Sequence, residues 1–140
     1  NDRVDIALAA GADGVHVGAD DLPATVARRL LGPDLIVGAT CRNAEDARRA
    51  QAEGASYLGV GPVYATSTKT GLPDPIGPRG VDVVAAAVDV PVIAISGITA
   101  DNAAAVLDAG AWGVAVVGAV YGADDPVASL RQLMELTGCA

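Results

Sequence analysis

Residues 108–118 read Asp-Ala-Gly-Ala-Trp-Gly-Val-Ala-Val-Val-Gly, and this order of residue types decides the fold because it occurs three times. The other two copies lie at residues 9–18 and 53–61. In each copy a helical pattern ends at a glycine, which can take the left-handed conformation that stops a helix. The apolar run that follows is too short for a second helix and is typical of a buried strand. Each copy therefore predicts a junction between a helix and a strand.

Two further apolar runs, at residues 35–39 and 90–96, are rich in Val and Ile and predict two more strands. Asn43 is expected to cap one helix, and Asp125, directly before Pro126, is expected to cap the last one. Helical patterns cover residues 2–10 and lie near residues 22–31, 43–53, 80–88, 101–109 and 126–136.

The strict alternation of five strands with helices predicts an α/β fold, either an open doubly wound sheet or part of a closed barrel. A barrel normally has eight strands in roughly 250 residues, so 140 residues would leave two or three strands unaccounted for. The chain begins at Asn1 inside a helical pattern, and we expect further sequence upstream.

Composition excludes several classes of partner. A hydrophobic content of 51% suits a packed core, whereas a net charge of -8 argues against nucleic acid and anionic membrane surfaces. No apolar run is long enough to span a bilayer and no leader pattern opens the chain, so a cytoplasmic protein is expected. Cys41 and Cys139 have neither a disulfide framework nor metal-ligand spacing, and no role is assigned to them.

In either architecture the functional edge lies at the carboxyl ends of the strands. The strand at residues 57–61 is followed by Thr66, Ser67, Thr68 and Lys69, and Lys69 is the only lysine in the chain. Its compact charge suits phosphate oxygens, although an exposed loop lysine is the alternative. The Gly- and Pro-rich residues 70–80 form either a lid or a plain surface loop.

Gly97 and Gly118 follow the last two strands, where small residues expose backbone N–H groups. Phosphate commonly binds such amides at the last two strand ends of a barrel. The alternative is that both glycines only permit tight turns.

Acidic residues mark the other side of the predicted site. Asp2, Asp20 and Asp21 are either helix N-caps or, for a pair on neighbouring strand ends, ligands of Mg²⁺. His16, flanked by valines, is expected to face the barrel interior, where a hydrogen-bonded structural role is favoured over a catalytic one. Thr40 adds a hydroxyl at the same edge.

The order of these segments resembles the thiamine phosphate synthase family over nearly the whole chain. The resemblance is carried by Asn1-Asp2, Val15-His16-Val17-Gly18 with Asp21-Leu22, Gly61-Pro62-Val63-Tyr64 with Thr66-Ser67-Thr68-Lys69, Ala94-Ile95-Ser96-Gly97-Ile98 and Gly113-Val114-Ala115-Val116-Val117-Gly118.

The resemblance implies a (β/α)8 TIM barrel, of which residues 1–140 would be a single-domain C-terminal portion with about the last five βα units, lacking the N-terminal two to three strands. It implies a transferase that joins a hydroxymethylpyrimidine diphosphate to a thiazole phosphate through a pyrimidine cation, giving thiamine phosphate and pyrophosphate. Asp2 and Asp21 would bind Mg²⁺, and Lys69 and Thr40 would be catalytic. The implied substrate-binding residues are Asn1, Thr40, Thr66, Ser67, Thr68, Lys69, Gly97, Val117 and Gly118.

The sequence departs from the family pattern at four positions. Thr40 replaces a usual Ser and keeps its hydroxyl, Arg42 replaces a frequent His, Ser96 replaces a common Gly, and Gly118 replaces a usual Ser, which leaves only its amide. A related thiazole tautomerase shares the thiazole phosphate site. Asp21 and Thr68 favour the synthase, whereas the segment Gly71-Leu72-Pro73 resembles the tautomerase. A non-catalytic, phosphate-binding barrel fragment is the remaining alternative. The expected partners are small-molecule substrates, without nucleic acid or membrane, and the sequence is compatible with a homo-oligomer.

Overall fold

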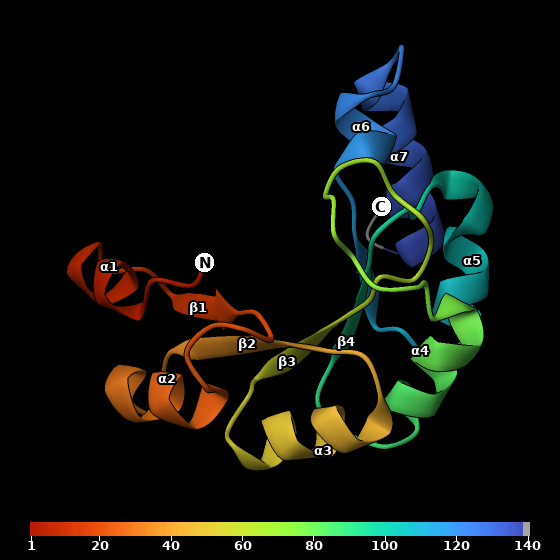
Figure 1. Cartoon of the computed structure of the whole chain (residues 1–140). Coiled ribbons are helices and arrows are strands. Elements are labelled where there is room, and N and C mark those ends of the chain that lie inside the picture. The colour runs from red at the N-terminus through yellow and green to blue at the C-terminus, as the bar shows by residue number, and fades with distance from the viewer. Residues whose placement is uncertain (139–140) are drawn as a thin grey trace.

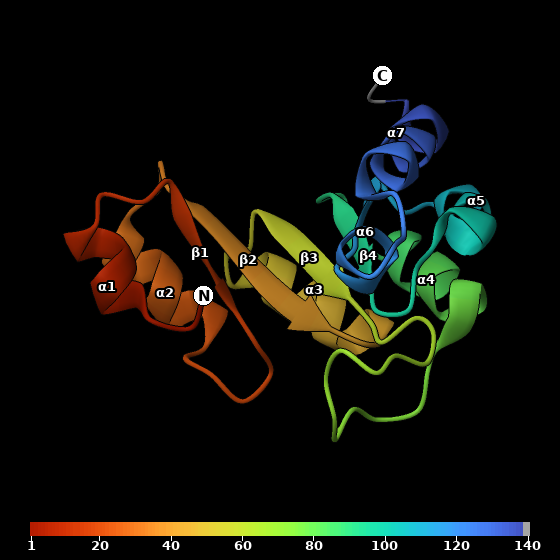
Figure 2. The same cartoon turned by 90° about the horizontal axis from the view of Figure 1, so that it is seen from above.

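The computed structural model describes residues 1–138, which form a curved sheet with helices on its convex side (Figures 1 and 2). The strands follow one another in the order β1-β2-β3-β4-β5, and every neighbouring pair is parallel. A doubly wound sheet reverses its strand order at a switch point, whereas this order is that of a barrel wall. The strands are β1 (Gly14–Val17), β2 (Ile36–Cys41), β3 (Tyr57–Val60), β4 (Val92–Ile95) and β5 (Gly113–Ala115).

The helices lie between successive strands or flank the sheet ends. They are α1 (Val4–Ala9), α2 (Ala24–Leu31), α3 (Ala44–Ala52), α4 (Gly77–Ala85), α5 (Ala100–Asp108), α6 (Gly118–Tyr121) and α7 (Pro126–Thr137). Among residues 1–138 no helix combines the length and the apolar content that crossing a bilayer requires.

Strand alternation divides the sheet into two faces. Val37, Leu58 and Val60 are fully buried beneath the helices, where they pack with Val84 of α4 and Val106 of α5. The alternate residues of each strand face the opposite, concave side. His16, Gly38 and Tyr57 lie side by side there, because His16 is in register with Gly38 and Gly38 is in register with Tyr57. The core therefore fixes which side chains face the inside of the barrel wall.

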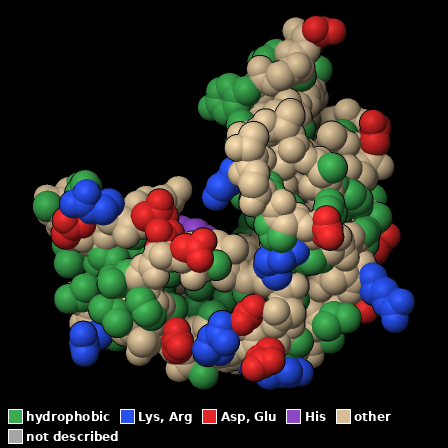
Figure 3. All heavy atoms as spheres, viewed as in Figure 1, with side chains coloured by type: hydrophobic (Ala, Val, Ile, Leu, Met, Phe, Trp, Pro, Cys, Tyr) green, Lys and Arg blue, Asp and Glu red, His purple; other side chains and the backbone are tan. Residues whose placement is uncertain are grey.

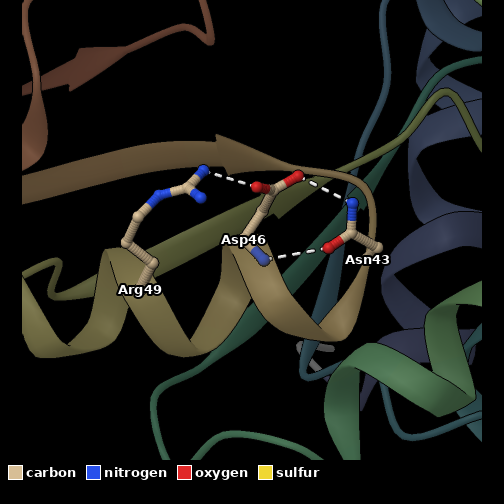
Figure 4. Close-up of polar contacts among 3 residues, drawn as sticks. All are labelled: Asn43, Asp46 and Arg49. Carbon is tan, nitrogen blue, oxygen red and sulfur yellow. Dashed lines mark hydrogen bonds and ion pairs between the residues drawn. The ribbon is translucent and has the colours of Figure 1, made fainter.

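Both predicted helix caps are confirmed. The Asn43 side chain accepts a hydrogen bond of 2.9 Å from the Asp46 amide, and the Asp125 side chain accepts one of 2.9 Å from the Ala128 amide. The Asp46 carboxylate also forms an ion pair with Arg49, one turn further along α3. It accepts a second hydrogen bond from the side-chain amide nitrogen of Asn43 (Figure 4). These contacts fix the start of α3 directly after β2.

One helix begins well before its predicted start, and one short helix was not predicted. The helix expected near residues 80–88 begins at Gly77, because Pro78 can occupy the first turn, where its missing N–H costs nothing. The single helical turn α6 after β5 is not among the helices that the sequence predicted. Cys41 is buried, and burial raises the pKa of its thiol to about 12, while Cys139 lies outside the described residues.

Candidate functional site

A cavity of about 620 Å³ opens at the carboxyl ends of β3, β4 and β5. This volume falls within the range that holds small organic ligands. Of the nine residues predicted to bind substrate, the cavity gathers all except Asn1, namely Thr40, Thr66, Ser67, Thr68, Lys69, Gly97, Val117 and Gly118.

An apolar wall that the sequence prediction overlooked completes the cavity. Ile95 at the end of β4, Ile98 beyond it and Leu72 in the long loop contribute to this wall. The signal was present in the alternation of β4, since Val92 and Ala94 are buried against the helices and Ile95 must therefore face the other way. An apolar wall facing hydroxyl and amide donors suits a ligand with a flat or aliphatic body and a charged end.

Gly97 and Gly118, whose amides were predicted to bind phosphate, differ in whether the local structure requires glycine. Gly97 has a φ of 66°, and a Cβ there would lie 2.4 Å from the carbonyl oxygen of Ala65. A Cβ at Gly118 would meet only Thr68 Oγ1, at 3.8 Å, so no steric demand imposes glycine at that position. The tight-turn interpretation therefore accounts for Gly97 but not for Gly118.

Replacing Gly97 by alanine is expected to cost about 3 kcal/mol of unfolding free energy, because backbone strain and a backbone clash act together. Gly11→Ala is the matched control, since its φ of 64° imposes the same strain but nothing lies within 4 Å of the added Cβ. That control should cost about 1 kcal/mol. Denaturant unfolding of both variants measures the difference, and equal losses would contradict a role for the Ala65 contact.

Lys69 is the only charged side chain among the described residues that line the cavity. It is exposed, and the loop that follows it is held against β2 by Arg42, whose guanidinium donates a 2.7 Å hydrogen bond to the carbonyl oxygen of Asp74. Arg42 thus contacts the loop rather than the cavity. The geometry leaves the Lys69 ammonium group available to an anionic ligand.

The N-cap interpretation of Asp2 and Asp21 is wrong. The N-cap positions of α1 and α2 are Arg3 and Pro23, and neither helix start receives a side-chain capping bond. Asp2 instead takes a left-handed φ of 63° and its amide donates to the carbonyl oxygen of His16 at 2.9 Å. The Asp21 carboxylate accepts a 2.8 Å hydrogen bond from the Gly18 amide.

Both carboxylates lie near the His16 ring, at the carboxyl end of β1. Burial lowers the pKa of His16, and the negative charges of Asp2 and Asp21 each partly oppose that shift. No group of three or more His, Cys, Asp or Glu side chains within residues 1–138 is arranged to hold a metal ion. Mg²⁺ is usually held by one or two carboxylates together with water and substrate phosphates, so a pair of aspartates fits its donor preferences.

A second hollow, of about 280 Å³, adjoins the first. Asp21 and Thr40 both line it, and Thr40 lines the larger cavity as well. Within residues 1–138, Thr40 is the one residue that the two hollows share, whereas Asn1 and Asp2 line neither. Figure 3 shows the hollowed face, with acidic side chains along its left side and a basic side chain opposite.

His16 has the hydrogen-bonded environment that the sequence favoured. Its Nδ1 lies 2.9 Å from the Tyr57 hydroxyl oxygen and its Nε2 lies 2.9 Å from Thr40 Oγ1. The ring is half-buried on the concave face, next to the larger cavity through Thr40.

Comparison with known proteins identifies close relatives. Residues 1–120 match the family described as thiamine monophosphate synthase. The chain is 54% identical to the thiamine-phosphate synthase of Salinispora arenicola and 52% identical to that of Moorella thermoacetica, over 99% and 97% of its own length. It spans 67% and 65% of the length of those two relatives.

The structural comparison agrees with the sequence comparison. The thiamine phosphate pyrophosphorylase of Pyrococcus furiosus superposes with a TM-score of 0.85 at 42% sequence identity. The match covers 98% of the present chain and 65% of that structure. The barrel wall seen here is therefore also that of a solved relative.

Proposed function

Because the chain belongs to the thiamine monophosphate synthase family, we propose that its cavity forms part of an active site that joins a pyrimidine diphosphate to a thiazole phosphate. The observation that carries this proposal is the gathering of eight predicted substrate-binding residues around one cavity. They supply hydroxyl groups, backbone amides and one ammonium group, which are the donors that phosphate oxygens accept from.

The proposed reaction breaks the bond between the pyrimidine methylene carbon and the diphosphate oxygen. The electron pair of that bond leaves with the diphosphate, and the thiazole nitrogen then donates its lone pair to the methylene carbon. No side chain has to remove a proton in either step. The residues of the chain contribute by neutralising the departing anion and by holding the two partners in line.

The two ends of the cavity suit different parts of the reactants. Lys69 and Thr40 are proposed to contact the diphosphate. Thr66, Thr68 and the amides of Gly97 and Gly118 are proposed to hold the thiazole phosphate, while the apolar wall at Ile95 and Ile98 contacts the rings. Such a division places the attacking nitrogen between the two phosphate groups.

We further propose that Asp2 and Asp21 hold Mg²⁺ on the side of the site away from the thiazole phosphate. When bound, the cation would neutralise charge on the diphosphate oxygens. This proposal is supported by carboxylate oxygens that accept no hydrogen bond within residues 1–138. Asp21 uses only Oδ2, which accepts from the Gly18 amide, and neither side-chain oxygen of Asp2 has a hydrogen-bond partner there.

The test of the activity is direct. The protein that carries this chain is expected to form thiamine phosphate and pyrophosphate when given both substrates and Mg²⁺, with product measured by chromatography. A correctly folded protein that yields no thiamine phosphate would contradict the synthase proposal. Isomerisation of the thiazole phosphate without coupling would instead identify a tautomerase.

A further inference from the structure

Tyr57, His16 and Thr40 form a continuous hydrogen-bonded row on the concave face of the sheet. Both bonds of the row, Tyr57 hydroxyl to His16 Nδ1 and His16 Nε2 to Thr40 Oγ1, measure 2.9 Å. The three residues come from β3, β1 and β2, so the row crosses three strands. Thr40 lines both hollows, whereas Tyr57 lines neither.

Two glycines make the space in which this row lies. A Cβ on Gly38 would stand 2.3 Å from Tyr57 Cζ and 2.4 Å from His16 Nδ1. A Cβ on Gly59 would stand 3.0 Å from His16 Cε1. The imidazole therefore crosses β2 through space that any other residue at position 38 would fill, and the row depends on glycine there.

The row can run in two directions, and the hollows beside Thr40 distinguish between them. A neutral imidazole carries one N–H and one bare nitrogen, and a phenol can donate once. Burial raises the pKa of Tyr57, so its hydroxyl keeps its proton at neutral pH. Either tautomer leaves one hydroxyl proton without a protein acceptor among residues 1–138, namely that of Tyr57 if Nδ1 carries the ring proton or that of Thr40 if Nε2 carries it. Thr40 lines both hollows, where a ligand can accept its proton, whereas Tyr57 lines neither. With the proton on Nε2, Tyr57 donates to His16 and His16 donates to Thr40.

We propose that Tyr57 is a positioning residue that acts through His16, so that the Thr40 hydroxyl turns its own proton toward the ligand in the cavity. A phosphate oxygen only accepts hydrogen bonds, so this direction matches a phosphorylated ligand. In the opposite direction Thr40 would give its proton to His16 and offer the ligand only lone pairs. Only the identity of the ligand depends on the proposed function.

The first test reads the imidazole directly. His16 is the only histidine in the chain, so the chain labelled with ¹⁵N-histidine gives the nitrogen signals of one ring. The ring proton is expected on Nε2, and Tyr57→Phe should shift the Nδ1 signal because that nitrogen loses its donor. Tyr121→Phe, which removes a hydroxyl from a side chain that is 86% exposed, should leave the signal unchanged. A proton on Nδ1 in the unsubstituted chain would overturn the proposal.

The second test asks whether Tyr57 acts through Thr40. Tyr57→Phe is expected to lower kcat/KM for the pyrimidine diphosphate by about fivefold to tenfold, as for one lost neutral hydrogen bond. In a Thr40→Val background the same change should have no further effect, because the hydroxyl that the row positions is gone. Equal losses in both backgrounds would show that Tyr57 does not act through Thr40.

The two tests separate failure of the row from failure of the proposed function. The nitrogen signals of His16 are read without substrate or turnover. An unsubstituted protein with the expected imidazole signals but no coupling activity would therefore contradict the synthase proposal and support the row.

Discussion

Lys69→Met is expected to lower kcat/KM for the coupling reaction by about a thousandfold. Methionine keeps the apolar stem of the side chain and removes the ammonium group, so the change isolates the charge. Negative charge grows on the diphosphate as its bond to carbon breaks, and a fixed cation stabilises that state more than the ground state. No other charged side chain among the described lining residues can replace it.

The control for Lys69 has to remove a positive charge elsewhere, because the chain already carries a net charge of -8. Arg131→Gln on α7 does so at an exposed position outside both hollows. That variant should keep nearly full activity. Comparable steady-state activities of the two variants would mean that Lys69 acts only through the overall charge of the protein.

Asp21→Asn is expected to lower kcat/KM by about a hundredfold and to raise the concentration of Mg²⁺ needed for half-maximal activity. Asparagine retains an oxygen that can accept from the Gly18 amide, so the turn after β1 should persist. The unfolding free energy should therefore change by about 0.5 kcal/mol or less. A large activity loss without a stability loss is what distinguishes a metal ligand from a structural carboxylate.

Asp20→Asn supplies the matched control, because it neutralises the exposed carboxylate one residue earlier. We expect its activity and its dependence on Mg²⁺ to equal those of the unsubstituted protein. Titration of activity with Mg²⁺, together with thermal unfolding, measures both variants. If the two asparagine variants behaved alike, the assignment of Asp21 as a metal ligand would fail.

Much of the fold was predictable because local chemistry determined it. The glycines that end helices at residues 11, 54 and 110 all take positive φ angles, and a strand begins within a few residues of each. Asn43 and Asp125 cap helices through hydrogen bonds to residues only three positions further along the chain. The location of the cavity followed from the rule that parallel strands share one functional edge.

The features that escaped prediction depend on contacts between distant segments. Tyr57 meets His16 across a sequence separation of 41 residues, and that contact exists only because the strand register places Gly38 between them. Similarly, Arg28 donates to the carbonyl oxygens of Leu35 and Gly54, which lie on either side of β2 in the chain. No local pattern in the sequence specifies such register.

Asp2 illustrates a third source of error. Its position before a helical pattern made an N-cap a reasonable alternative, yet its left-handed backbone and its bond to His16 shift the helix start to the next residues. Aspartate tolerates that conformation better than most residues, but the preference is too weak to predict from one sequence.

The position of Thr40 in the wall between the two hollows has a thermodynamic consequence. Both hollows are lined by this residue, so a molecule that shifts it from one side alters the lining of the other. By reciprocity, each occupant then changes the dissociation constant of the other by the same factor, whichever is added first. Replacing Thr40 would therefore change the dissociation constants of both occupants.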